Sequence, residues 1–158
     1  MDKKLTLYFD TSVISHLDQP DNPQNTLITQ KLWDSCKNQE YIVFISELVL
    51  IELEGCNPAK KSKLYGYLRQ VDYNLIFLTK EISNLAEKYI NSAIIPQKFR
   101  SDALHIAAAT VSNCDFLVSW NFKHIVRAKT ILGVNGINKL TGYKEIQIVS
   151  PNMLVDEE

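Results

Sequence analysis

Three acidic residues of this chain, Asp10, Glu52 and Asp102, stand where carboxylates could do chemistry together. Asp10 directly follows an apolar, β-favouring run, and Asn121 follows another such run later in the chain. Carboxylates gathered at one place repel one another unless a cation lies between them, and oxygen ligands suit Mg²⁺ or Mn²⁺ better than zinc. Such an ion can activate a water molecule and stabilise the charge of a phosphoryl transition state. The four residues therefore raise the hypothesis of a metal site that acts on phosphate.

Alternating strands and helices are predicted from one end of the chain to the other. The apolar, β-rich runs that predict strands are residues 4–9, 41–46, 73–78, 115–120 and 145–151. Helical periodicity fills the segments between them. This alternation is typical of a parallel sheet with helices on both faces. We predict an α/β fold, a three-layer α/β/α sandwich around a central, mostly parallel sheet of about five strands.

Several helix ends are predicted from local residue types. Asp10 and Ser46 stand at N-cap positions, and a further cap is expected near Ser101. The run GVNGINKLTG, residues 133–142, is predicted to end a helix and continue as a loop. It lacks the spacing of a phosphate-binding P-loop and follows a helix rather than a strand.

The predicted sheet brings the candidate residues to one edge. In parallel α/β sheets, sites form outside the carboxyl ends of the strands. Asp10 and Asn121 directly follow strands, and Glu52 lies in the helix after the second strand. Asp102 lies in the first turn of the helix that leads back to the fourth strand, so it should reach the same edge. Asp115 precedes that strand and is expected at the opposite edge.

Structural roles remain open for all of these residues. Asp10 could be a helix cap alone, Glu52 a surface acid, Asp102 a first-turn acid and Asn121 a turn residue. The apolar neighbours of Glu52 predict a partly buried acid, which needs a partner. His105 lies three residues after Asp102 and is predicted to be packed or hydrogen-bonded rather than catalytic.

Length and composition fit one globular domain. The chain has 158 residues, of which 46% are hydrophobic and 22% charged. We expect a single domain over residues 1–150 and a short acidic tail over 151–158. The formal net charge of −1 gives no strong attraction to nucleic acid. No signal peptide or membrane span is predicted, so a cytoplasmic protein is expected. The three cysteines have neither zinc-site nor disulfide spacing.

Four segments carry a resemblance to a known family. They are YFDTSVISHL (8–17), ELVLIELEG (47–55), FRSDALHIAAA (99–109) and DFLVSWNFKHI (115–125). In this order and at these distances they resemble the signature segments of PIN-domain nucleases. More narrowly, they resemble VapC-type toxin ribonucleases of type II bacterial toxin–antitoxin systems. The resemblance extends over nearly the whole chain.

The resemblance implies roles for particular residues. Asp10, Glu52 and Asp102 match the family's invariant acids, which would hold Mg²⁺ or Mn²⁺ and align a water on an RNA phosphate. Asn121 falls where many members carry a fourth acid, and it could ligate through its amide oxygen or a bound water. Ser12 matches a small polar position that could orient a ligand or phosphate. An RNA substrate, an antitoxin partner and a homodimer are also implied by the resemblance.

Three basic residues flank the predicted site and are candidates for RNA contact: Arg100, Lys123 and Arg127. Phosphate contacts from these side chains would make RNA binding salt-dependent. The alternative is a solvated basic face without a ligand.

Two other functions are weighed. A phosphatase with Asp10 as nucleophile would resemble haloacid-dehalogenase-like enzymes, but these usually carry D-x-D where this chain has Ser12. A non-catalytic PIN-like module that binds RNA or protein is the alternative, and Asn121 in place of an acid is its best support.

Overall fold

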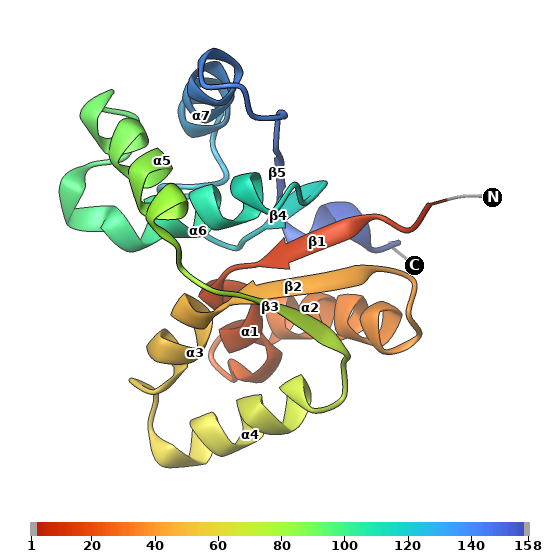
Figure 1. Ribbon diagram of the computed structural model, residues 1–158. Helices are drawn as coiled ribbons and strands as arrows, with labels where there is room; N and C mark the ends of the chain where they lie inside the picture. Colours follow the sequence, from red (N-terminus) through yellow and green to blue (C-terminus); the bar gives the residue numbers. More distant parts are fainter. Residues whose placement is uncertain (1–2, 157–158) are drawn as a thin grey trace.

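Five strands form one parallel sheet in the computed structural model, which describes residues 3–156 (Figure 1). The strands are β1 (Thr6–Phe9), β2 (Ile42–Ser46), β3 (Tyr73–Ile76), β4 (Phe116–Val118) and β5 (Gln147–Val149). Their order is β3-β2-β1-β4-β5, and every neighbouring pair is parallel. Along the chain, β2 and β3 are added on one side of β1, and β4 and β5 are then added on its other side. This reversal at the carboxyl end of β1 is where ligands bind in open α/β sheets.

Both faces of the sheet are buried, which explains why the strands are apolar without alternation. Leu7 and Phe9 of β1 pack into the core on one face, and Tyr8 between them packs into the core on the other. All three side chains are fully buried.

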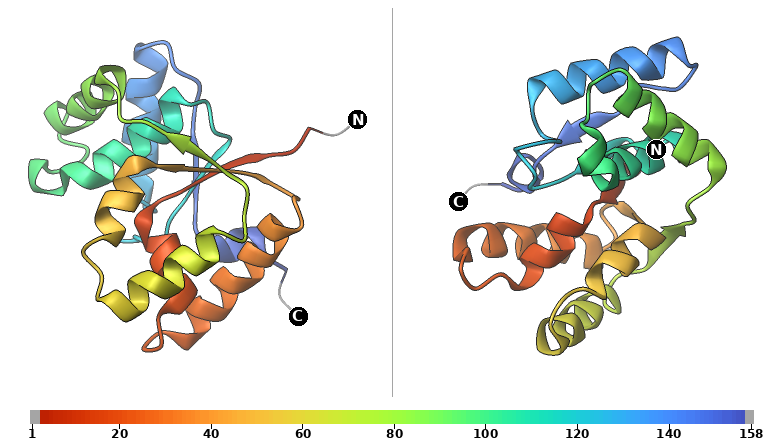
Figure 2. Two further views of the ribbon diagram at one scale, coloured as in Figure 1. Left: turned by 60° about the horizontal axis from the view of Figure 1, so that its bottom comes forward. Right: turned by 90° about the vertical axis from the view of Figure 1, so that its left-hand side faces the viewer.

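Helices cover the two faces in two groups. The α-helices are α1 (Thr11–Ser15), α2 (Pro23–Lys37), α3 (Glu47–Leu53), α4 (Pro58–Leu68), α5 (Lys80–Asn91), α6 (Arg100–Val111) and α7 (Ala128–Leu140). Short 3-10 helices are η1 (His16–Asp18), η2 (Gln97–Phe99) and η3 (Pro151–Leu154). Helices α1 to α4 lie on one side of the sheet and α5 to α7 on the other, as Figure 1 and both views of Figure 2 show. The predicted three-layer α/β/α sandwich is confirmed.

Of two predicted caps, Ser46 is confirmed in its position and the one near Ser101 is wrong. Ser46 does occupy the N-cap position of α3, but its side chain makes no capping hydrogen bond because its hydroxyl contacts Tyr8 Oη at 2.8 Å. Helix α6 begins after Phe99 rather than at Ser101, which is exposed within its first turn. Neither helix has a side-chain capping hydrogen bond at its N-terminus.

The predicted end of the last helix at Gly133 is also wrong, because α7 continues through Gly133 and Gly136 to Leu140. A Cβ atom on Gly133 would lie 2.8 Å from Ile94 Cγ1, so glycine is needed there for close packing rather than for a turn. The glycine that does follow the helix is Gly142, with φ +85°.

The end of the described chain packs on the domain. In η3, Pro151 is buried, and Leu154 and Val155 pack against the core on the α2 side. The last two residues of the expected acidic tail, 157–158, lie outside the described residues. Among the helices of residues 3–156, none is long and apolar enough to cross a membrane.

Candidate active site

Asp10 is buried at the carboxyl end of β1, with only 3% of its surface exposed. Its Oδ1 accepts hydrogen bonds from Ser12 Oγ at 2.6 Å and from the Val13 amide at 3.2 Å. Its Oδ2 accepts a hydrogen bond from Ser119 Oγ at 2.6 Å. A buried charge needs such partners, and three donors supply them. Asp10 is therefore both the N-cap of α1 and a fixed carboxylate, so the helix-cap role and a role in the site are compatible.

Ser12 and Ser119 are themselves fixed by the backbone that follows β4. The amide of Trp120 donates to Ser12 Oγ, and the amide of Asn121 donates to Ser119 Oγ, both at 2.9 Å. Each hydroxyl thus accepts from an amide and donates to Asp10. Ser119 is a residue that sequence reasoning missed, because only the pairing of β1 with β4 brings it to Asp10.

Glu52 has the partners that a half-buried acid needs. Its Oε1 lies 2.6 Å from Thr11 Oγ1, which donates to it, and 2.7 Å from His105 Nε2. Burial by itself raises the pKa of Glu52, but the hydrogen bond and charge of His105 and the hydrogen bond from Thr11 lower it below its ordinary value. Glu52 is therefore held as a carboxylate next to Thr11, the residue that follows Asp10.

Asp102 lies in the first turn of α6, as predicted. Burial raises the pKa of its carboxyl group, and the negative charges of Asp10 and Glu52 raise it further against the opposing effect of His105 and His124. The charges of Asp10 and Glu52 thus act on the carboxyl group of Asp102. Asp115 lies at the opposite end of β4, as expected, where its Oδ2 accepts from the amide and hydroxyl of Thr6.

The donor chemistry of the three acids fits a hard divalent cation, although a complete ligand shell is not preformed. Within residues 3–156, no group of three or more His, Cys, Asp or Glu side chains is arranged to hold an ion. Mg²⁺ usually takes only one or two protein carboxylates and keeps several waters. Asp10, with both oxygens fixed, and Asp102, with a destabilised negative charge, suit that mode of binding.

The side-chain oxygen of Asn121, a possible metal ligand by prediction, accepts hydrogen bonds from the backbone instead. Its Oδ1 accepts from the amides of Lys123 and His124, at 3.2 and 2.9 Å. Both acceptor positions of the amide oxygen are therefore used to close the turn after β4. An ion bound through this oxygen would have to displace one of these amides. Asn121 is a turn residue in this structure, and its contact with a metal-bound water stays a prediction.

The three basic candidates differ in their availability. Arg100 pairs with Glu87, so its charge is already partly compensated. Lys123 and Arg127 are exposed in the loop after β4, where Arg127 Nη1 donates to the carbonyl of Lys123 at 3.2 Å. Their contact with RNA stays a prediction.

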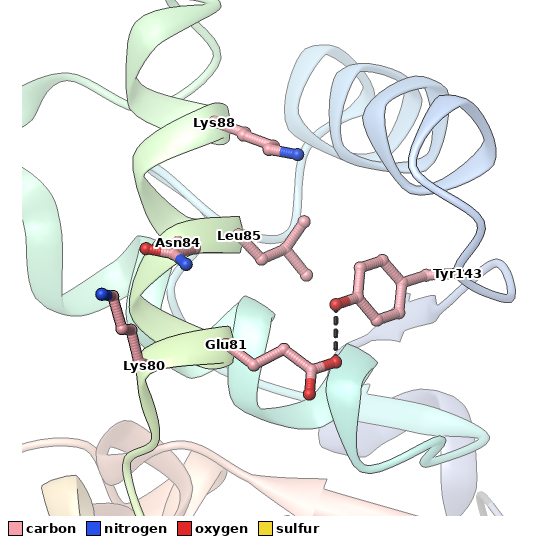
Figure 3. Close-up of a pocket in the computed structure, with 6 residues that line it drawn as sticks. All are labelled: Lys80, Glu81, Asn84, Leu85, Lys88 and Tyr143. Atoms are coloured by element: carbon pink, nitrogen blue, oxygen red, sulfur yellow. Dashed lines mark hydrogen bonds between the residues drawn. The ribbon is translucent and has the colours of Figure 1, made fainter.

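A surface pocket lies elsewhere, along α5 (Figure 3). It is lined by Lys80, Glu81, Asn84, Leu85, Lys88 and Tyr143. Tyr143 Oη donates to Glu81 Oε2 at 2.7 Å across its mouth. None of the predicted site residues lines this pocket.

Replacing Asp102 by asparagine should stabilise the metal-free protein. The raised pKa means that the folded state binds this proton more tightly than the unfolded chain does, so ionisation of Asp102 weakens the fold. This destabilisation by ionised Asp102 is present at pH values above the folded-state pKa and disappears at pH values below the unfolded-state pKa. At neutral pH we expect Asp102→Asn to raise the free energy of unfolding by about 1 kcal/mol. Thermal melts in EDTA should show a rise of roughly 2–4 °C.

Asp72→Asn is the matched control, since Asp72 is exposed, and it should leave the melting temperature unchanged. The advantage of Asp102→Asn should shrink as the pH falls through the carboxyl range. A lower melting temperature for Asp102→Asn at neutral pH would contradict this account of the site.

Comparison with known proteins supports the fold. No protein-family model and no curated protein matches the sequence. The structure has a PIN-like α/β fold, as the sequence resemblance implied. It superposes on a chain of VapBC2 from Rickettsia felis, solved by crystallography with a DNA fragment from their promoter. The TM-score is 0.57 at 14% sequence identity, over 92% of this chain and 98% of that one. At this identity the likeness concerns the fold.

Proposed function

We propose that this chain is a metal-dependent endoribonuclease that hydrolyses RNA phosphodiester bonds. The observation that carries the proposal is the way two acids are held after neighbouring strands of a PIN-like sheet: Ser12 and Ser119 donate to Asp10, and Thr11 and His105 contact Glu52. A site that gathers three acids is one that a divalent cation would stabilise.

Each acid has a distinct part in the proposed mechanism. Asp10, fixed by Ser12 and Ser119, would bind Mg²⁺ or Mn²⁺ together with Asp102 and Glu52, of which Glu52 is held by Thr11 and His105. When bound, the ion supplies a more acidic water and charge stabilisation for the phosphoryl transition state. Lys123 and Arg127 would contact phosphates next to the cleaved bond. RNA affinity should therefore fall as the salt concentration rises.

The fold likeness also supports a biological setting. The chain superposes on one chain of the VapBC2 structure, and we propose by analogy that this protein is a cytoplasmic toxin of a bacterial toxin–antitoxin pair. An antitoxin would then cover or occupy the acidic edge, and the protein would form a homodimer. Co-purification of the chain with the product of an adjacent gene, with loss of RNA cleavage in the complex, would test the pairing.

A direct assay tests the enzymatic part of the proposal. Purified protein is incubated with a pool of end-labelled RNAs in Mg²⁺, in Mn²⁺ and in EDTA. We expect cleavage with either ion and none in EDTA. RNA binding without cleavage in any condition would instead favour a non-catalytic PIN-like module. One observation favours that second candidate: Asn121 brings no charge to the site, and its oxygen is already bonded to two amides.

Divalent ions should also stabilise the fold. An ion that binds only the native state adds about 2.7 kcal/mol to the free energy of unfolding at roughly 100 times its dissociation constant. Thermal melts with increasing Mn²⁺ should therefore move upward. The shift should be much smaller for Asp10→Ala, which lacks the most strongly fixed carboxylate of the site. An equal shift in both proteins would place the ion elsewhere.

A further inference from the structure

His105 is hydrogen-bonded through both of its ring nitrogens beside the proposed site. It lies on α6 and is only 3% exposed. Its Nε2 is 2.7 Å from Glu52 Oε1, and its Nδ1 is 2.6 Å from Tyr8 Oη. Tyr8 Oη is in turn 2.8 Å from Ser46 Oγ, and both of those side chains are fully buried. A continuous chain of hydrogen bonds thus joins the core to a candidate site residue.

The order of donors along this chain follows from its two ends. An ionised carboxylate can only accept, so Nε2 of His105 carries the proton that points to Glu52. When the imidazole is uncharged, Nδ1 is then an acceptor and takes the Tyr8 O–H. Burial keeps the pKa of Tyr8 well above its ordinary value, so this hydroxyl retains its proton. Ser46 completes the chain by donating to Tyr8 Oη. With one tautomer of His105, every polar atom in this series of hydrogen bonds has a partner.

Glu52 needs such support because of where it stands. It lies near the end of the short helix α3, and about a third of its side chain is exposed. Thr11 and His105 both contact Oε1, whereas Oε2 has no hydrogen-bond partner within residues 3–156. The two donors therefore fix one oxygen of the carboxylate and leave the other available.

We propose that His105 is a positioning residue, which uses its Tyr8–Ser46 chain to orient the ring and its Nε2–H to hold Glu52 for metal binding. This inference rests on the proposed function, in which Glu52 serves a divalent ion. His105 acts only through Glu52 and does not itself contact ion or RNA. Thr11 is the second donor of the same arrangement.

Two amide substitutions at one position separate this role from a packing role. The amide nitrogen of glutamine in His105→Gln can replace Nε2 and still donate to Glu52. The shorter side chain in His105→Asn can replace Nδ1 and reach Tyr8 but not Glu52. Both variants lose the ring, so both should be similarly destabilised in thermal melts. Calorimetric titration of the full chain with Mn²⁺ then measures the ion affinity of each.

We expect His105→Asn to weaken Mn²⁺ binding by about 10–100-fold, the usual effect of losing the partner of a metal ligand. His105→Gln should recover most of that loss. A second readout uses the metal-free native protein, in which nitrogen NMR shifts should show protonated Nε2 and unprotonated Nδ1 for His105. In Tyr8→Phe, which lacks the donor to Nδ1, the spectrum should change toward a mixture of tautomers.

The outcomes separate the two proposals. If native protein binds Mn²⁺ but the two His105 variants bind it equally, the positioning role is overturned and the proposed function stands. The same conclusion follows if the proton is found on Nδ1. If native protein neither binds Mn²⁺ nor cleaves RNA, the proposed function fails, and the role of His105 toward an ion fails with it.

Discussion

Replacement of Asp10 by asparagine is expected to lower metal-dependent RNA cleavage by at least about 100-fold. Loss of an outer partner of a metal ligand already costs 10–100-fold, and Asp10 is proposed as a ligand itself. The fold should survive, because the asparagine amide fits the same space and the hydroxyls of Ser12 and Ser119 can rotate to donate or accept. Single-turnover cleavage of an end-labelled RNA, with circular dichroism of both proteins, measures the effect.

Asp115→Asn is the matched control for this experiment. The carboxylate of Asp115 also accepts hydrogen bonds from a backbone amide and a hydroxyl, both of Thr6, but at the opposite edge of the sheet. Its replacement should leave the cleavage rate unchanged in Mg²⁺ or Mn²⁺. Full, EDTA-sensitive activity of Asp10→Asn would remove Asp10 from the mechanism.

Replacement of Ser119 by alanine should give the second large effect. It removes the donor to Asp10 Oδ2 and the acceptor of the Asn121 amide together. Leaving a buried polar group without its partner costs about 1–3 kcal/mol of stability. Because Asp10 then loses one of its two fixed oxygens, we expect cleavage to fall by roughly 10–100-fold. Urea unfolding and cleavage kinetics at a temperature where the variant is fully folded separate the two effects.

Ser92→Ala serves as the control, since Ser92 is exposed at the far end of α5. It should change neither stability nor cleavage. If Ser119→Ala loses stability but keeps the native rate, Ser119 supports the fold and not the carboxylate.

Much of the fold could be predicted because its signals are local. A strand buried on both faces must be apolar throughout, so Leu7, Tyr8 and Phe9 predict β1 without reference to the rest of the chain. The acid that ends this run is then at the carboxyl edge of the sheet. The need of Glu52 for a partner was equally readable, because charged side chains beside apolar ones are seldom buried alone.

The remaining features depend on contacts between distant segments. Ser119 and Asp10 are 109 positions apart, and nothing near either one indicates the other. The true end of α7 was missed because the packing of Gly133 against Ile94 outweighs the low helix propensity of glycine. A contact between distant segments also explains Ser46, whose hydroxyl contacts Tyr8 Oη instead of capping α3.

The link between Asp10 and Ser119 has a consequence for the order in which the molecule is made. Domains are synthesised from the N-terminus at roughly 5–20 residues per second, and parallel sheets need distant strands before they close. A nascent chain carries Asp10 from the start but has no partner for its Oδ2 until β4 has emerged. The carboxylate is therefore fixed only after Ser119 of this 158-residue sequence has been made. A chain released between residues 102 and 119 would contain all three acids and still lack the arrangement that holds the first of them.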